Sequence, residues 1–97
     1  MKKENEFQPN LIKDIQKMYP DAIIFKTDPT YIQGIPDLII LHGKKWAALE
    51  TKREKGAKKQ PNQPYYVDLM NKMSFSRFVF PENKEEVLNE LQQSFES

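Results

Sequence analysis

The sequence predicts an α/β protein with a mixed four-stranded sheet flanked by helices, in the order helix, strand, strand, strand, helix, strand, helix. Three stretches carry apolar residues at every third or fourth position, which is typical of amphipathic helices. Four short apolar runs lie between them, and two of these runs flank a turn at Gly43, as in a β-hairpin. With 97 residues the chain has room for one domain, which we place at residues 1–97.

The composition excludes several classes of protein. The chain has no cysteine, so it forms no disulfide bond, no thiolate zinc site and no cysteine nucleophile. No apolar run approaches the ~20 residues that span a bilayer, and the lysines near the N-terminus precede no apolar secretory segment. We therefore expect a cytoplasmic protein without a membrane partner. Because the formal net charge is only +1, the distribution of charge matters more than its total.

The first half of the chain supplies one helix and three strands. Residues 6–19 are predicted to form a helix with an apolar stripe made by Phe7, Leu11, Ile12, Ile15 and Met18. Residues 22–27 are predicted to form a short strand. The runs 38–41 and 46–49 form the hairpin, and the continuous apolar character of residues 38–41 predicts a central strand that is buried on both faces.

The second half supplies two helices and the fourth strand. Residues 62–73 are predicted to form a helix with Asn62 as the N-cap. Residues 77–80 form the strand. A final helix starts at Asn83, because Asn83 and Glu86 have the spacing of a capping box, and its apolar face consists of Val87, Leu88, Leu91 and Phe95.

Three charged residues are predicted to meet at one end of the hairpin. Asp37 begins the first strand and Glu50 and Lys52 end the second, so antiparallel pairing brings them together. Since side chains alternate along a strand, Thr51 points away from the other two. Charges beside apolar sequence are unfavourable unless they are paired or bind a metal. This set suits a magnesium ion with a lysine beside it, as in phosphodiester cleavage; an exposed Glu/Lys pair is the alternative.

The same residues resemble the signature of a known family. Pro36-Asp37 followed by Glu50-Thr51-Lys52 is similar to the motif of the PD-(D/E)XK nuclease superfamily. With Gly34 in front and Gln63 behind, the pattern resembles the VRR-NUC branch and the small phage endonucleases that resolve four-way (Holliday) junctions. The resemblance implies a restriction-endonuclease-like core over nearly the whole chain, in a bacterial or phage-infected cell. Gly34 implies positive φ or close approach to a phosphate; an ordinary turn glycine is the alternative.

The resemblance assigns roles to these residues in a metal-dependent DNA endonuclease. Asp37, Glu50 and the backbone carbonyl of Thr51 would bind Mg²⁺ or Mn²⁺, as one ion or two, and Lys52 would position or deprotonate the attacking water. Two assignments have rivals in the sequence. An acidic residue on the first helix would complete the metal site, and the candidates are Glu6, Glu4 and Asp14. A glutamine that opens the second helix would lean towards the site, and the candidates are Gln63 and Gln60.

A basic loop at residues 53–61 follows directly after the Glu50–Lys52 strand. We expect it to contact the phosphates of DNA together with Lys26, through Arg53, Lys55, Lys58 and Lys59. By resemblance the substrate is branched DNA and the protein is a homodimer, with the last helix as a candidate dimer surface. The alternatives are a nuclease that cuts single strands or duplexes, a DNA-binding module that does not cleave, and an interaction domain in which this loop is merely solvated.

Overall fold

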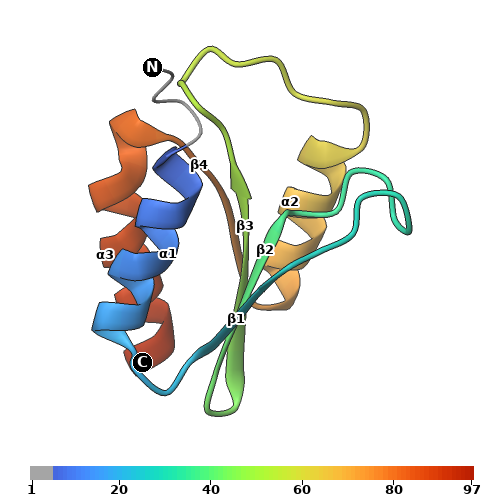
Figure 1. Ribbon diagram of the computed structural model, residues 1–97. Helices are drawn as coiled ribbons and strands as arrows, with labels where there is room; N and C mark the ends of the chain where they lie inside the picture. Colours follow the sequence, from blue (N-terminus) through green and yellow to red (C-terminus); the bar gives the residue numbers. More distant parts are fainter. Residues whose placement is uncertain (1–5) are drawn as a thin grey trace.

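The helices and strands follow one another in the predicted order (Figure 1). The computed structural model describes residues 6–97. Its elements are α1 (Phe7–Met18), β1 (Ile23–Lys26), β2 (Leu38–His42), β3 (Lys45–Thr51), α2 (Gln63–Met73), β4 (Phe75–Val79) and α3 (Lys84–Glu96), with a short 3-10 helix, η2 (Pro81–Asn83), before α3. Within the described residues, no helix is both long enough and apolar enough to cross a membrane.

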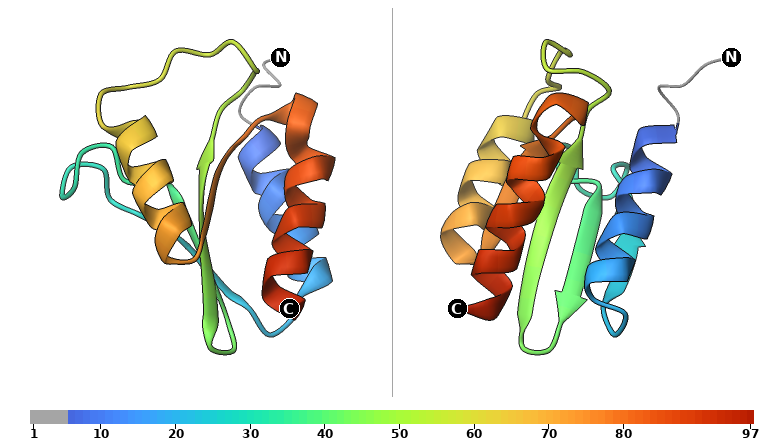
Figure 2. Two further views of the ribbon diagram at one scale, coloured as in Figure 1. Left: turned by 180° about the vertical axis from the view of Figure 1, so that it is seen from behind. Right: turned by 90° about the vertical axis from the view of Figure 1, so that its left-hand side faces the viewer.

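The strands form one mixed sheet in the order β1-β2-β3-β4. Each of the first three strands is antiparallel to the next, whereas β4 runs parallel to β3 because the chain crosses over through α2. Helices α1 and α3 lie on one face of the sheet and α2 lies on the other (Figures 1 and 2). The predicted α/β class and the mixed four-stranded sheet are therefore confirmed.

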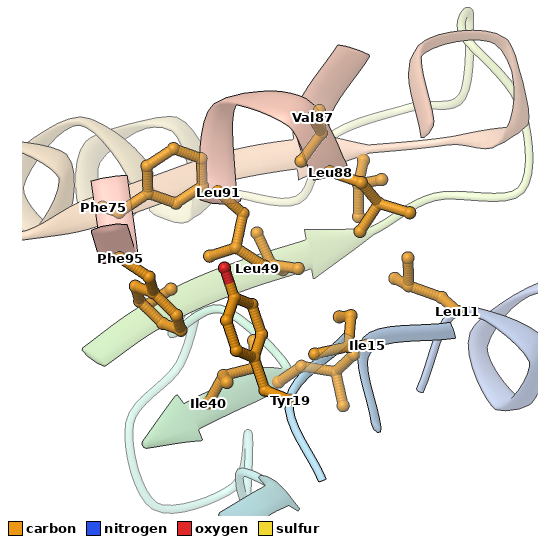
Figure 3. Packing of buried hydrophobic residues seen from close by; sticks show 13 residues of the cluster. Leu11, Ile15, Tyr19, Ile40, Leu49, Phe75, Val87, Leu88, Leu91 and Phe95 are labelled. Atoms are coloured by element: carbon orange, nitrogen blue, oxygen red, sulfur yellow. The ribbon is translucent and has the colours of Figure 1, made fainter. Parts of the chain in front are cut away.

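The main hydrophobic core lies between the sheet and the pair α1 and α3. Alternate residues of β2 and β3 point into it, and Leu38, Ile40 and Leu49 are fully buried. Figure 3 shows the helices contributing Leu11, Ile15, Val87, Leu88, Leu91 and Phe95 to the same cluster. The predicted apolar stripes of the first and last helices are thus the surfaces that pack on the sheet.

The opposite face of the sheet is only partly covered. Helix α2 packs on β3 and β4. The prediction that residues 38–41 are buried on both faces is therefore wrong, because Ile39 is only half-buried and Leu41 is 38% exposed. One helix covers about half of a four-stranded sheet, and an apolar run does not reveal how many helices cover it.

Three local predictions need correction. Strand β4 begins at Phe75, two residues earlier than expected, because only Ser74 separates it from α2. Asn62 lies at the N-cap of α2 with φ 75° and makes no side-chain capping bond. Asn83 does not form the predicted capping box with Glu86, because its side chain turns back to β4: Oδ1 accepts a bond from the Phe80 N–H at 2.9 Å, and Nδ2 donates to the Phe78 carbonyl at 3.1 Å.

Candidate active site

The candidate site lies where β2 begins and β3 ends. Leu38 of β2 pairs with Leu49 of β3, so the next residues, Asp37 and Glu50, lie beside each other at the same end of the hairpin. The Thr27 N–H donates to the Asp37 carbonyl at 3.0 Å, which fixes the backbone of Asp37 against the strand on its other side. The hairpin register thus brings the two carboxylates together as the sequence predicts.

The side chains of β3 divide between the two helical layers. Glu50 and Lys52 contact Gln63 at the start of α2, whereas Thr51 contacts Gln8 at the start of α1. This division follows from the alternation of side chains along a strand, and it agrees with the predicted opposite direction of Thr51. The end of β3 therefore connects the first turns of α1 and α2.

Three hydrogen bonds hold the Asp37 carboxylate. The Thr51 backbone N–H donates to Oδ1 at 3.1 Å, and the Thr51 hydroxyl donates to Oδ2 at 2.7 Å. Gln8 Nε2 donates to Oδ2 at 3.3 Å and to Thr51 Oγ1 at 3.1 Å. Burial raises the pKa of Asp37, and these bonds from Thr51 oppose the rise. These bonds fix the orientation of the Asp37 carboxylate.

Gln8 is the residue that sequence reasoning missed. It lies three residues before Leu11 and seven before Ile15, so it occupies the apolar stripe of α1 that faces the sheet. A polar residue in such a stripe needs a hydrogen-bond partner when it is buried. A glutamine within the apolar stripe of α1 was therefore the signal in the sequence that could have identified Gln8.

Glu50 is the least exposed charged residue of the site, at 4%. Its Oε2 accepts a hydrogen bond from Gln63 Nε2 at 2.9 Å, whereas its Oε1 is buried and has no hydrogen-bond partner. Burial, followed by repulsion from Asp37, raises the pKa of Glu50 to about 7, and the positive charge of Lys52 opposes this. A buried oxygen without a donor is unfavourable and is therefore available to a cation.

Gln63 joins Glu50 to Lys52. Its Oε1 accepts bonds from Lys52 Nζ at 2.7 Å and from the Gln60 N–H at 2.8 Å. Lys52 Nζ also donates to the Lys58 carbonyl at 3.1 Å and lies 3.9 Å from Glu50 Oε2. Gln63 therefore has the position expected for the glutamine of the second helix, while its rival Gln60 contributes only its backbone.

The donor set fits a hard divalent cation. Asp37 and Glu50 supply carboxylate oxygens, one of them buried without a partner, and their mutual repulsion would be relieved by a bound cation. Magnesium usually keeps several waters and needs only one or two protein carboxylates. Among residues 6–97 no group of three or more histidine, aspartate or glutamate side chains could hold a metal ion. Any further ligand would be a backbone oxygen, such as that of Thr51, or water.

The three acidic residues proposed to complete the site have different outcomes. Glu6 is the exposed N-cap of α1, and no group of three carboxylates that could hold a metal is found among residues 6–97, so its role as an outer or third acidic ligand stays a prediction. Asp14 instead forms an ion pair with Lys84 of α3. Glu4 lies outside the described residues. In place of a third carboxylate, α1 presents the amide of Gln8.

The basic loop arches from the end of β3 to the start of α2 (Figure 1). With the start of α1 it encloses a hollow of about 500 Å³, whose lining includes Gln8, Thr51, Lys52, Arg53 and Lys58. This hollow is polar and adjoins the carboxylates, which suits a phosphate backbone. The remaining predicted DNA-binding residues lie at its margin or beyond it.

Those remaining residues differ in their surroundings. Lys59 Nζ lies 4.7 Å above the ring of Phe78, next to Glu50 across the sheet, and Lys55 is exposed on the loop. Lys26 is exposed at the end of β1, where it lines a second hollow with Phe25 and Tyr31. Arg53 and Lys58 therefore line the same hollow as Lys52, whereas Lys26 lines another.

Comparisons with protein-family models, with curated proteins and with solved structures find no match to this chain. The assignment of a function therefore depends on the residues of this site and on the order of its elements.

Glu50→Gln is expected to flatten the pH dependence of stability. Since the pKa of Glu50 is about 7 in the folded protein against an ordinary 4.5, its contribution to stability is lost as pH rises between these values. The shift corresponds to roughly 3 kcal/mol, and screening by water at the open side of the site reduces it to about 1–2 kcal/mol. Melting at pH 5 and pH 8 should show Glu50→Gln gaining about 5–10 °C on the wild type at the higher pH.

The matched control is Glu54→Gln, which removes an exposed carboxylate of the basic loop. Its melting profile should run parallel to that of the wild type. At pH 8 Mg²⁺ should raise the melting temperature of the wild type but not of Glu50→Gln, and the effect should fade at pH 5 as protons compete for the carboxylate. Parallel profiles for wild type and Glu50→Gln, with or without Mg²⁺, would contradict this assignment of Glu50.

Proposed function

We propose that this chain is a metal-dependent DNA endonuclease of the PD-(D/E)XK type with a restriction-endonuclease-like core. The observation that carries the proposal is the buried, unpartnered oxygen of Glu50, which lies beside Asp37 and Lys52 at the edge of a basic hollow. The order of elements supports it, since helix, three strands, helix and strand is the order of the core that the resemblance implies.

Each residue of the site has a distinct task in this proposal. Asp37, Glu50 and the Thr51 carbonyl would hold Mg²⁺ or Mn²⁺, which when bound supplies a Lewis acid and lowers the pKa of water. Gln8 keeps the Asp37 carboxylate in place, and Gln63 does the same for Glu50 and Lys52. The Lys52 ammonium positions the attacking water and stabilises negative charge on the phosphate as it develops.

The basic loop would hold the DNA backbone across the hollow. Phosphate contacts from Arg53, Lys55, Lys58 and Lys59, together with Lys26 of β1, would give binding that weakens as salt rises and that reads no bases. We propose branched DNA as the substrate, because a site without base-reading side chains must select by shape. Symmetric cleavage of a four-way junction needs two active sites, so the proposal includes a homodimer.

The test is a cleavage assay on a panel of labelled substrates. Four-way junction, flap, single strand and linear duplex are each incubated with the wild type in Mg²⁺, Mn²⁺ or EDTA, and with Asp37→Asn, which keeps the shape of the side chain. Metal-dependent cutting of the junction and flap, absent in EDTA and reduced at least ~100-fold in Asp37→Asn, is expected because a carboxylate ligand is lost.

Other outcomes lead to other functions. Equal cutting of every substrate would retain the active site and remove the preference for branched DNA. Salt-sensitive binding of the junction without cleavage in any metal would replace the nuclease with a non-cleaving DNA-binding module. Absence of both binding and cleavage would leave the basic loop as a solvated segment of an interaction domain.

A further inference from the structure

The exposed apolar side chains of this protein are gathered on one side of the sheet. Within residues 6–97, every exposed large hydrophobic side chain belongs to β1, to the end of β2, to the loop between these strands or to α2. Figures 1 and 2 place that loop beside α2, on the side of the sheet opposite to α1 and α3. Such segregation is not expected of isolated surface residues and indicates an interaction surface.

The first part of this surface is the uncovered half of the sheet. Ile23 pairs with Leu41, and Phe25 pairs with Ile39, so all four side chains point to the same face. That face is the one on which α2 packs, since the intervening Ile24 and Ile40 point into the core on the other face. Ile23 is 62% exposed and Phe25 is 45% exposed. We call these four residues the β1–β2 floor.

The second part is a row of side chains on α2. Tyr65, Leu69 and Met73 lie at intervals of four residues, which places them in one line along the helix, and they are 61%, 37% and 68% exposed. Asn71, on another side of the helix, accepts a bond from the Ser76 N–H of β4, and Val67 is buried against the sheet. We call this row the α2 ridge, and it is a second apolar surface without a partner in the described chain.

We infer that the protein forms a two-fold symmetric dimer in which the α2 ridge of each copy packs on the β1–β2 floor of the other. The floor lacks the helix that would complete the layer over the sheet, and the ridge belongs to a helix with an unused apolar side. A two-fold axis between two α2 helices covers the floor and buries the ridge of both copies at once, because every contact in such a dimer occurs twice.

The area and charge of the surface favour a second copy as the occupant. Taking about 200 Å² for a large side chain, the exposed fractions of the six exposed residues in the floor and the ridge amount to roughly 600 Å² per copy, at the lower end of what one partner of a specific interface buries. The floor carries no charge, which disfavours DNA. Asp68 and Lys72 pair at 3.4 Å beside the ridge, so this part of the rim is neutral and gives no preference for an anionic lipid surface.

The oligomeric state tests this directly. The inference rests on the homodimer of the proposed function and names the surfaces that form it. Sedimentation of the full chain in EDTA and without DNA tests the dimer apart from cleavage, and it should show a dimer. Leu69→Glu should weaken dimerisation at least ~30-fold, because a charge would be buried at the centre of the interface. Gln16→Glu introduces the same residue on the exposed side of α1 and should leave the dimer unchanged. Melting curves confirm that each variant is folded, and Met73→Glu repeats the test at a more exposed position.

Cross-linking tests the predicted pairing of floor and ridge. Because the chain has no cysteine, Phe25→Cys and Met73→Cys introduce single reactive groups. A short bismaleimide should join the two variants when they are mixed, whereas a mixture of Gln16→Cys and Met73→Cys should not be joined.

Either of two results would overturn the inference. One is a wild type that stays monomeric at roughly 100 µM, a concentration at which even a weak specific dimer would form. Binding of this monomer to lipid vesicles would assign the surface to a membrane. The other is a Leu69→Glu variant that dimerises as tightly as the wild type, because the contact would then use another face, such as α3.

Discussion

Replacement of Lys52 by methionine is expected to lower the rate of the proposed metal-dependent DNA cleavage by about 1,000-fold. A positioned donor that stabilises charge in the transition state contributes ~10²–10³ to the rate, and help with proton transfer contributes ~10²–10⁴. Methionine keeps much of the length of the side chain and removes the charge. Single-turnover cleavage of the best substrate at saturating enzyme measures the chemical step without the influence of binding.

Binding of DNA should change little in Lys52→Met. The Lys52 side chain is only 12% exposed, and Nζ is directed to Gln63 and to the Lys58 carbonyl, so it contributes little to the outer surface of the basic loop. Lys44→Met, at the hairpin turn on the far end of β2 and β3, is the matched control and should cleave normally. Cleavage by Lys52→Met at the wild-type rate would remove Lys52 from the mechanism, and loss of binding together with cleavage would make it a DNA-binding residue.

The pairing of Asp37 with Glu50 could be predicted because it depends on local rules. A two-strand hairpin fixes which residues are opposite, and alternation of side chains fixes which of Glu50, Thr51 and Lys52 share a face. The helices that pack on the sheet were predictable for the same reason, since their apolar residues recur at every third or fourth position. These rules need no knowledge of distant parts of the chain.

Contacts between helices and the ends of strands could not be predicted in this way. Whether Glu6 or Gln8 reaches Asp37 depends on the rotation of α1 over the sheet, which is set by the packing of Leu11 and Ile15 and not by charge. Propensity would favour Glu6, because an acidic residue suits a helix N-terminus. Glu6 is the N-cap of α1, and Gln8 donates the hydrogen bond to the Asp37 carboxylate.

Which parts of the sheet the helices cover also could not be predicted from the sequence. Residues 38–41 are apolar throughout, and such a run is typical of a strand that is buried on both faces. Only the position of α2 over β3 and β4 shows that one side of β2 is uncovered. If the inferred dimer forms, the sequence pattern is satisfied after all, because the second face of β2 is then buried by the other copy.

Gly34→Ala is expected to destabilise the protein by roughly 3 kcal/mol and to reduce cleavage at the same time. Gly34 has φ +91°, and a Cβ at this position would lie 2.5 Å from Asn62 Cβ and 2.9 Å from the Asn62 carbonyl carbon. Positive φ costs an alanine about 1–2 kcal/mol, and a clash with backbone atoms adds about 1–3 kcal/mol. At about 5 °C for each kcal/mol, the melting temperature should fall by about 15 °C.

The remaining two glycines separate the cost of positive φ from the cost of the contact with Asn62. Gly43 has φ +62° with open space around it, so Gly43→Ala should lose about 1 kcal/mol from backbone strain alone. Gly56 has neither positive φ nor a close neighbour, and Gly56→Ala should stay within about 0.5 kcal/mol of the wild type. Equal losses for Gly34→Ala and Gly43→Ala would mean that the contact with Asn62 is not tight.

The effect of Gly34 on cleavage follows from what lies next to Asn62. Gln63 is the following residue and holds both Glu50 and Lys52, so a displaced Asn62 moves the amide that positions these two residues of the proposed active site. The glycine in front of the Pro36-Asp37 motif is then explained by contact with the start of α2, and no phosphate is needed at that position. Gly43→Ala, at the far end of the hairpin, should lose stability with cleavage intact when both are measured well below the melting temperature. Full cleavage by folded Gly34→Ala would show that the loop before Asp37 and the position of Gln63 are independent.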